Sequence, residues 1–281
     1  MPVRLIRNCS VLDVPADGEV TVATHQDIEI ADGVITAVRA TQLDDVDGQV
    51  VDGTGLLAIP GLTNSHTHSP MVMFRGAAED VSVDDWFNSR IWPMEVDLTP
   101  ERVRVGARLA CAEMLLSGVT GFVDHYFHAD QIALAAQELG IRADIAPTYF
   151  SSSGAQGRQA VFDAVDAILA MNDPRIRASL GPHSTYTVTE EDLQVTADHA
   201  RDRGLKIHLH AAENMDQTRS SLERLGVTPI QVAERTGVID AGTVIAHGCG
   251  ITRPTSRSSR ATRTVRAWLR APRATSSSRS T

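Results

Sequence analysis

Residues 121–150 read GFVDHYFHADQIALAAQELGIRADIAPTYF, and this stretch decides the fold. Its two ends, GFVDHY and IRADIAPTYF, are short runs with the composition of buried strands. The part between them, ADQIALAAQELG, repeats apolar residues at helical spacing and closes at Gly140. A strand, a helix and a second strand in so short a segment predict a βαβ unit with parallel strands.

The same alternation continues on both sides of this unit. Helical patterns occupy residues 101–118, 158–173 and 189–204, and strand patterns include IRASLGPH, KIHLHAAE and TVIAHGCG. Repeated βα units of similar length predict an α/β fold of the TIM-type (β/α)8 barrel. About six βα units precede residue 251, whereas a closed barrel has eight. The predicted barrel is therefore incomplete.

The regions outside the barrel differ in composition. Residues 1–58 contain short strand patterns with Asp-Gly turns and predict a small all-β domain, followed by the barrel over residues 59–251. Residues 252–281 form an Arg/Ser/Thr-rich tail with eight arginines and no acid. A basic arm for nucleic acid or membrane is one interpretation. The abrupt change favours the other, a segment foreign to the fold and read in a shifted frame, which we expect to be disordered and without a part in catalysis.

Composition limits the function classes. The 281 residues are 42% apolar and can bury a large core. The net charge of −9 argues against nucleic acid as a partner, and no apolar run approaches the length of a membrane span. The amino terminus has no signal-peptide layout, and three scattered cysteines (Cys9, Cys111 and Cys249) form no disulfide framework. We expect a cytoplasmic protein.

Two histidines one residue apart follow an apolar strand pattern. In NSHTHSPM, residues 64–71, a strand would place His66 and His68 on the same face. Two neutral imidazoles side by side make half of a site for zinc or a similar cation. An ordinary polar loop after a turn is the alternative.

Further histidines end the later strands. His183, His210 and His247 each close a strand pattern, at the edge where barrel active sites are built. Each alone is more often structural, but so many together indicate a site. His210 lies nearer the strand end than His208 and is the better ligand, and Glu213 is placed to act as an acid or base. His25, His128 and His199 do not close a strand pattern, and we interpret them as structural. His125 is left between a structural and a supporting role.

Four of these motifs together resemble the amidohydrolase superfamily. They are PGLTNSHTHSPMVMFRG, GPHS at 181–184, HAAE at 210–213 and AHG at 246–248. The chain is most similar to the deaminases of S-adenosylhomocysteine and 5′-methylthioadenosine, which are grouped with the triazine chlorohydrolases. The resemblance covers roughly residues 1–251 and implies a barrel with a small amino-terminal β-sandwich domain.

The resemblance also implies roles for individual residues. One divalent metal, Zn²⁺ or alternatively Fe²⁺, is implied at His66, His68 and His210, with His247 orienting or activating water and Glu213 handling the proton on the ring nitrogen. Binuclear members use a carbamylated lysine at the end of the fourth strand. The single lysine of this chain, Lys206, begins the fifth, which favours one metal.

The segment DDWFNSRIWPMEVDLTPE resembles the family's substrate-binding region. The resemblance implies that Trp86 stacks on the base, that Glu95 holds the ribose hydroxyls, and that His183 lines the same pocket. An ordinary amphipathic loop is the alternative for Trp86 and Glu95. The family's last metal ligand, an aspartate ending the eighth strand, has no counterpart, because the pattern stops at Ile251. We therefore expect weak activity.

Three functions follow as hypotheses. The first is a metal-dependent deaminase of adenosine-type nucleosides (S-adenosylhomocysteine, 5′-methylthioadenosine or adenosine) that releases ammonia. The second is a hydrolase of triazine or pyrimidine rings, and the third is an inactive fragment or binding module. The expected partners are a small nucleoside or azine and water, with no nucleic acid and no membrane, and a homo-oligomer is left open.

Overall fold

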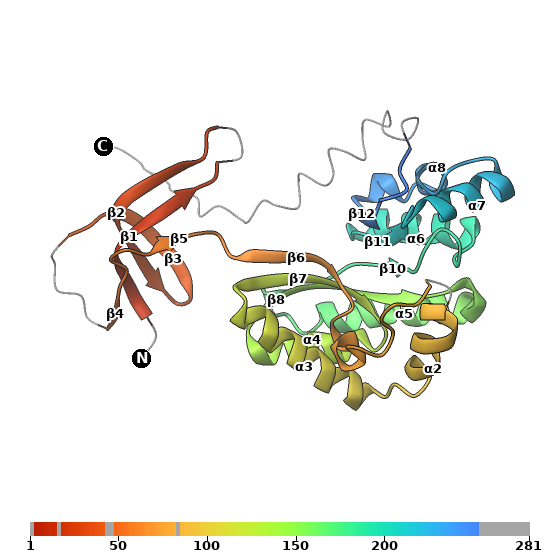
Figure 1. Ribbon diagram of the computed structural model, residues 1–281, viewed down its shortest axis with the longest axis horizontal. Coiled ribbons are helices and arrows are strands. Elements are labelled where there is room, and N and C mark those ends of the chain that lie inside the picture. The colour runs from red at the N-terminus through yellow and green to blue at the C-terminus, as the bar shows by residue number, and fades with distance from the viewer. Residues whose placement is uncertain (1–2, 16–17, 43–47, 83–84, 253–281) are drawn as a thin grey trace. The chain divides into compact units, whose positions relative to one another are not determined.

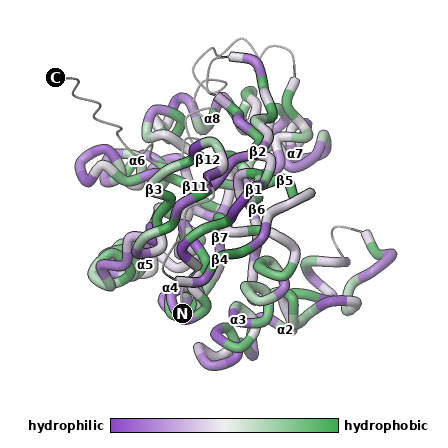
Figure 2. Tube along the Cα trace, turned by 90° about the vertical axis from the view of Figure 1, so that its left-hand side faces the viewer, coloured by the Kyte–Doolittle hydropathy of each residue, from purple (hydrophilic) through white to green (hydrophobic). Residues whose placement is uncertain are grey.

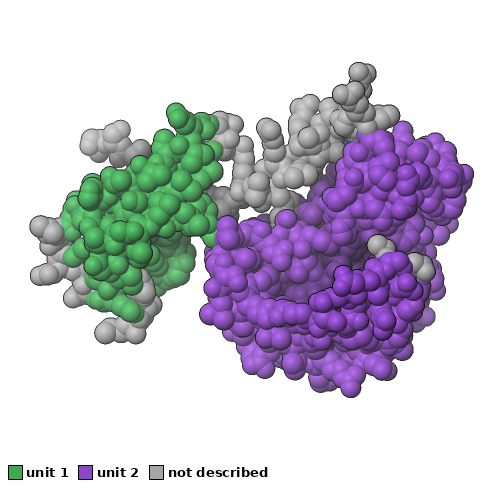
Figure 3. Space-filling view, in the orientation of Figure 1, with its two compact units in different colours: residues 1–61, 268–281 green, residues 62–267 purple. Residues whose placement is uncertain are grey.

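The chain divides into two compact units at Gly61 (Figure 3). The computed structural model describes residues 3–15, 18–42, 48–82 and 85–252. The prediction for the Arg/Ser/Thr-rich tail therefore lies almost entirely outside the described residues. The two units are described separately below.

The first unit is one five-stranded sheet (Figure 1). Its strands are β1 (Val3–Asp13), β2 (Thr21–Ala31), β3 (Val34–Ala40), β4 (Gln49–Asp52) and β5 (Leu57–Ala58). β1 lies between β2 and β4, and it also pairs with β5. The turn between β2 and β3 has Asp32 and Gly33 at φ 51° and 75°. Two positive φ values are the geometry for which hairpins select Asp-Gly, as this motif predicted.

The second unit is built on parallel strands that follow one another in chain order. They are β6 (Leu62–Thr67), β7 (Val119–Tyr126), β8 (Arg142–Tyr149), β9 (Ile176–Ala178), β10 (Gly181–Pro182), β11 (His208–Ala211) and β12 (Val244–His247). β9 and β10 both pair with β8, and parallel bridges from Leu180 to Ile207 and from Ser184 to His210 connect them to β11. β11 and β12 then pair with each other. The predicted α/β barrel fold is confirmed, and its described part is a curled half-barrel.

Helices follow the strands and cover the outside of this sheet (Figure 1). They are α3 (Pro100–Leu116), α4 (Ala129–Leu139), α5 (Gly154–Leu169), α6 (Glu190–Arg203), α7 (Met215–Leu225) and α8 (Pro229–Arg235). The Thr189 side chain accepts a hydrogen bond from Asp192 N and caps α6. Hydrophilic and hydrophobic colours mix along α3, as expected of a helix with one face on the sheet (Figure 2). No helix in the described chain is long and apolar enough to cross a lipid bilayer.

One helix is shifted from its predicted position. The pattern predicts a helix over residues 158–173, whereas α5 spans Gly154–Leu169. Two glycines at its beginning have low helix propensity, so the sequence pattern does not indicate the first turn of this helix. At its other end the backbone of Asn172 turns to φ 50°, which is outside the helical region and closes the segment early.

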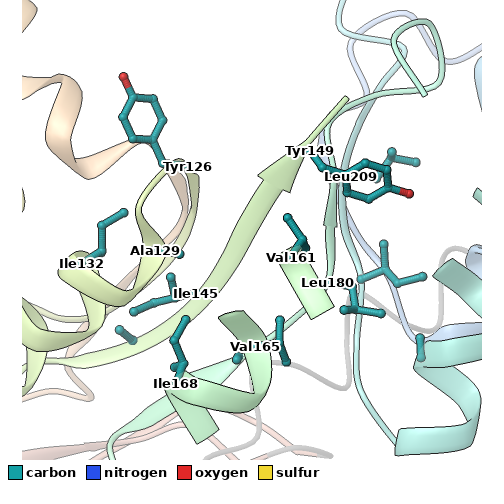
Figure 4. Packing of buried hydrophobic residues seen from close by; sticks show 14 of the residues in the cluster. Tyr126, Ala129, Ile132, Ile145, Tyr149, Val161, Val165, Ile168, Leu180 and Leu209 are labelled. Carbon is teal, nitrogen blue, oxygen red and sulfur yellow. The ribbon is translucent and has the colours of Figure 1, made fainter. Parts of the chain in front are cut away.

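The core of the second unit lies between the sheet and its helices. In Figure 4 Ile145 from β8 lies beside Ala129 and Ile132 of α4 and Ile168 of α5. None of these four side chains is more than 2% exposed. This packing fixes β8 in the sheet and with it the neighbouring strand ends.

Replacing Ile145 with alanine should therefore lower the free energy of unfolding by about 2–5 kcal/mol, the usual cost of deleting a buried aliphatic side chain. Denaturant unfolding followed by circular dichroism measures the change. Leu116 is 90% exposed, so Leu116→Ala serves as the control and should stay within about 0.5 kcal/mol of the parent. Equal effects of both substitutions would contradict the described core.

Candidate metal centre

Four histidines meet where β6, β11 and β12 end. His66 is the next-to-last residue of β6, His210 lies near the end of β11, and His247 is the last residue of β12. One ligand atom from each of these three lies within 4.8 Å of the others. The ring of His68 lies 5.0 Å from that of His66 and 5.2 Å from that of His210. The structure thus brings together all four histidines that the sequence placed at the metal or beside it.

In three of these rings, the Nδ1 atom faces another group of the protein. His68 Nδ1 donates to the backbone carbonyl of His125 at 2.5 Å, and His210 Nδ1 donates to that of His183 at 2.8 Å. His66 Nδ1 lies 2.9 Å from Nε2 of His208. In His68 and His210 the contact leaves Nε2 as the ring nitrogen that can bind a ligand, and in His66 it does so when Nδ1 is the donor. Tying the second ring nitrogen in this way is how proteins orient metal-binding histidines.

Burial keeps these rings neutral. It is the main cause that lowers the pKa of His66 to about 3, and the nearby His68 and His247 lower it further. The pKa values of His68 and His210 are also lowered, again chiefly by burial. A histidine binds a metal through an unprotonated nitrogen, so neutral rings fit a divalent cation at neutral pH. This set of nitrogen donors suits zinc or another borderline cation.

His247 differs from the other three histidines. It is exposed, and its backbone lies in the left-handed region at φ 71°. Non-glycine residues seldom adopt this conformation, and such residues cluster at functional sites. The turn it makes at the end of β12 places its ring 5.2 Å from that of His66 and 5.4 Å from that of His210.

Glu213 has a partner that the sequence did not indicate. It follows β11 by two residues, and the Tyr186 hydroxyl donates to its Oε1 at 3.1 Å. Burial, and after it the Glu213 carboxylate, raise the pKa of this tyrosine well above its ordinary value, so its hydroxyl stays protonated as a donor. The side chain of Gln217 accepts from the Glu213 backbone N at 3.1 Å. These two contacts fix the position of Glu213.

Glu95 likewise has a tyrosine partner. Tyr126, the last residue of β7, donates its hydroxyl to Glu95 Oε1 at 2.6 Å. Burial raises the pKa of Glu95, and the hydrogen bond from Tyr126 opposes that rise. The Tyr126 ring lies 5.8 Å from that of His68. Glu95 is therefore connected to the histidine cluster through Tyr126.

The other two predicted substrate residues differ in placement. His183 lies beside the cluster, with its ring 5.0 Å from that of His210, and it stacks on Phe150 at 4.5 Å. Trp86 begins the helical segment Trp86–Ile91, and its ring lies edge-on to Phe87 at 4.8 Å. Within the described residues Trp86 makes no ring contact with the histidines. Ring contacts thus connect His183 to the cluster, whereas the ring contact of Trp86 is with Phe87.

Asp124 supports the chain that follows the paired histidines. This completely buried residue of β7 accepts a hydrogen bond from Ser69 N at 2.9 Å. Burial raises its pKa to about 7, against the hydrogen bonds from Ser69. The contact orients the backbone directly after His68. Asp124 also escaped the sequence analysis, because an acid inside a strand gives no signal of its contacts.

The fold and the site define the class of (β/α)-barrel proteins with clustered histidines at the carboxyl ends of the strands. The sequence pattern of the amidohydrolase family matches residues 57–277, so the chain belongs to that family. The matched segment begins near the end of the first unit and includes every histidine described in this section.

Individual relatives agree with the family. The chain is 37% identical over 204 residues to a 5′-deoxyadenosine deaminase of Methanoregula boonei, covering 71% of this chain and 46% of that protein. It is 36% identical over 222 residues to a 5-methylthioadenosine/S-adenosylhomocysteine deaminase of Natronomonas pharaonis, covering 77% and 51%. The chain thus spans about half the length of the curated relatives it matches.

Solved structures give the same result. A zinc-bound adenosine deaminase of Xanthomonas campestris superposes with a TM-score of 0.76 at 28% identity, covering 90% of this chain and 59% of that one. The zinc-bound atrazine chlorohydrolase of Arthrobacter aurescens superposes with a TM-score of 0.73 at 24% identity, covering 88% and 65%. At that identity the second comparison supports the fold alone.

Proposed function

We propose that the chain is the metal-binding part of a hydrolytic deaminase of adenine nucleosides. The observation that carries this proposal is the histidine cluster, in which the protein occupies Nδ1 of His66, His68 and His210 and leaves Nε2 of each for a ligand. The names of the relatives add the substrate class, because they are deaminases of 5′-deoxyadenosine, of 5-methylthioadenosine or S-adenosylhomocysteine, and of adenosine. The partners are then a small nucleoside and water.

His66, His68 and His210 would hold one divalent metal, with zinc favoured and Fe²⁺ as the alternative. When bound, such a metal supplies a water whose pKa falls from 15.7 to about 7. His247, on the exposed side of the cluster, would orient that water. The low pKa of His66, about 3, keeps its ring available to the metal over the whole neutral range.

Glu213 would move the protons of the reaction. In the deamination of an adenine ring, water adds to the carbon that carries the amino group and one proton of that water goes to the neighbouring ring nitrogen. The C–N bond then breaks, and the amino group leaves as ammonia with the second proton. Glu213 lies three residues after His210, and Tyr186 fixes its Oε1. A positioned carboxyl group of this kind contributes about 10²–10⁴-fold to a rate.

Glu95, His183 and Trp86 would bind the nucleoside. The carboxylate of Glu95 can accept hydrogen bonds from the two ribose hydroxyls, and Tyr126 holds it in place. His183 lies between Phe150 and His210, where it can contact the base. Trp86, at the beginning of the segment Trp86–Ile91, would stack on the base.

Tyr126→Phe should weaken the binding of ribonucleosides, because Glu95 then loses a hydrogen bond and its pKa rises further. We expect KM to increase about 10-fold, the equivalent of about 1.4 kcal/mol for one hydrogen bond to a charged group, with kcat nearly unchanged. Steady-state kinetics measure both constants. A dideoxynucleoside, which lacks the ribose hydroxyls, is the control and should show no such change. The same increase for both substrates would contradict this role of Glu95.

Release of ammonia from the amino compounds, and of chloride from any chlorotriazine, tests the proposed function on a panel of substrates. The panel contains adenosine, 5′-deoxyadenosine, 5′-methylthioadenosine, S-adenosylhomocysteine and two amino- or chlorotriazines, assayed with the metal content of the same sample. We expect release from the nucleosides alone. Turnover of the triazines alone would instead support the ring hydrolase, and a zinc-loaded chain inactive on every substrate would support a binding module.

A further inference from the structure

We propose that His208 is a positioning residue that holds His66 in the tautomer able to bind the metal. The inference rests on the proposed metal site and adds to it a residue that binds no metal itself. His208 begins β11 and is 1% exposed. His210 lies two residues later on the same strand, so both side chains emerge on the same face.

The contact between the two rings is direct. His208 Nε2 lies 2.9 Å from His66 Nδ1, the ring centroids are 5.0 Å apart, and the ring planes meet at 76°. This is the geometry of an N–H group of one ring pointing at the lone pair of the other. The two residues are separated by 142 positions in the sequence and meet only because the sheet curls.

When both rings are neutral, one proton lies between these two nitrogens, and either His66 Nδ1 or His208 Nε2 carries it. If His208 donates, His66 carries its own proton on Nε2, and that nitrogen cannot bind a metal. If His66 donates from Nδ1, its Nε2 is a free lone pair directed away from His208. Only the second arrangement fits a metal at the cluster, and it requires His208 to act as the acceptor.

The surroundings of His208 support this assignment. Its side chain is buried, and the ring nitrogen that faces His66 is Nε2. A neutral His208 has one unprotonated nitrogen to offer as an acceptor. His68 and His210 reach the same Nδ1-protonated state by donating to backbone carbonyls. The partner of His66 Nδ1 is instead the side chain of His208, so a substitution of His208 can change the tautomer of His66.

Two substitutions separate this role from simple packing. His208→Leu keeps an apolar side chain of comparable bulk but removes the acceptor. His208→Gln keeps an acceptor, because its amide oxygen can receive the His66 Nδ1 proton. Competition with a chromophoric chelator measures zinc affinity for both variants and the parent. We expect His208→Leu to bind zinc about 10–100-fold more weakly, the usual cost of losing a partner of a metal ligand, and His208→Gln to recover most of that loss.

The ring nitrogens of His66 give a second measurement that does not depend on any variant folding. Nitrogen-15 chemical shifts of the metal-free parent at neutral pH should show the His66 proton on Nδ1. A proton on Nε2 would overturn the inference, as would equal zinc affinities of the parent and a folded His208→Leu. An equal loss in the leucine and glutamine variants would also overturn it. A parent that binds no zinc would overturn the proposed metal site as well, whereas the other results leave that site standing.

Discussion

Replacing His210 with alanine should remove most of the bound zinc. His210 is buried at the centre of the cluster, with its ring about 5 Å from those of His66, His68 and His247. Losing only a partner of a metal ligand costs about 10–100-fold in affinity, so losing the ligand should cost more than about 100-fold. His66→Ala should have a similar effect, because it removes another of the proposed ligands. Elemental analysis after dialysis, together with competition against a chelator, measures the loss.

A histidine outside the cluster provides the control. His25 lies in β2 of the first unit, is exposed, and has a backbone φ of 53°. Asparagine tolerates this conformation, so His25→Asn removes one histidine without straining the chain. It should leave zinc content unchanged. Full zinc content in both His66→Ala and His210→Ala would show that the metal, if bound, is held elsewhere.

Glu213→Gln should keep the metal and lose most of the turnover. The amide preserves the size of the side chain and can still accept from Tyr186, but it cannot exchange a proton with the substrate. We expect kcat on a nucleoside to decrease about 10²–10⁴-fold, while KM and zinc content stay close to those of the parent. Steady-state kinetics on the zinc-loaded chain measure this. The outcome separates a proton-transfer role from a structural one.

A carboxylate away from the site serves as the comparison for Glu213. Glu191 is exposed in the first turn of α6, and Glu191→Gln should leave kcat unchanged. A Glu213→Gln enzyme that turns over at the parent rate would remove Glu213 from the chemistry. Loss of zinc in that variant would instead make Glu213 a support of the metal.

The strand-end histidines could be predicted from the sequence because their signal is local. A histidine that closes an apolar strand pattern lies at the carboxyl edge of a parallel sheet, whichever strands are its neighbours. This reasoning selected His66, His210 and His247, whose ligand atoms the structure places within 4.8 Å of one another. The segment 121–150 was equally informative, since β7, α4 and β8 lie where its pattern predicted them.

The contacts that support these residues could not be predicted. Tyr126 meets Glu95 across 31 residues, and Tyr186 meets Glu213 across 27. Such pairs depend on how far the sheet curls and on the path of each loop, and neither leaves a periodic pattern in the chain. For the same reason the sequence pattern does not predict the contacts of substrate-binding residues on loops. Trp86, placed by resemblance, lies against Phe87 in the structure.

The identity of the product tests the central claim most directly. The zinc-loaded chain is incubated with 5′-deoxyadenosine in water enriched in heavy oxygen, and the product is analysed by mass spectrometry. We predict an intact nucleoside in which one heavy oxygen replaces the amino group of the base, with an equal amount of ammonia released, and no such product from His210→Ala. Free adenine, or unchanged substrate from a chain that has bound zinc, would contradict the assignment of this histidine cluster to a nucleoside deaminase.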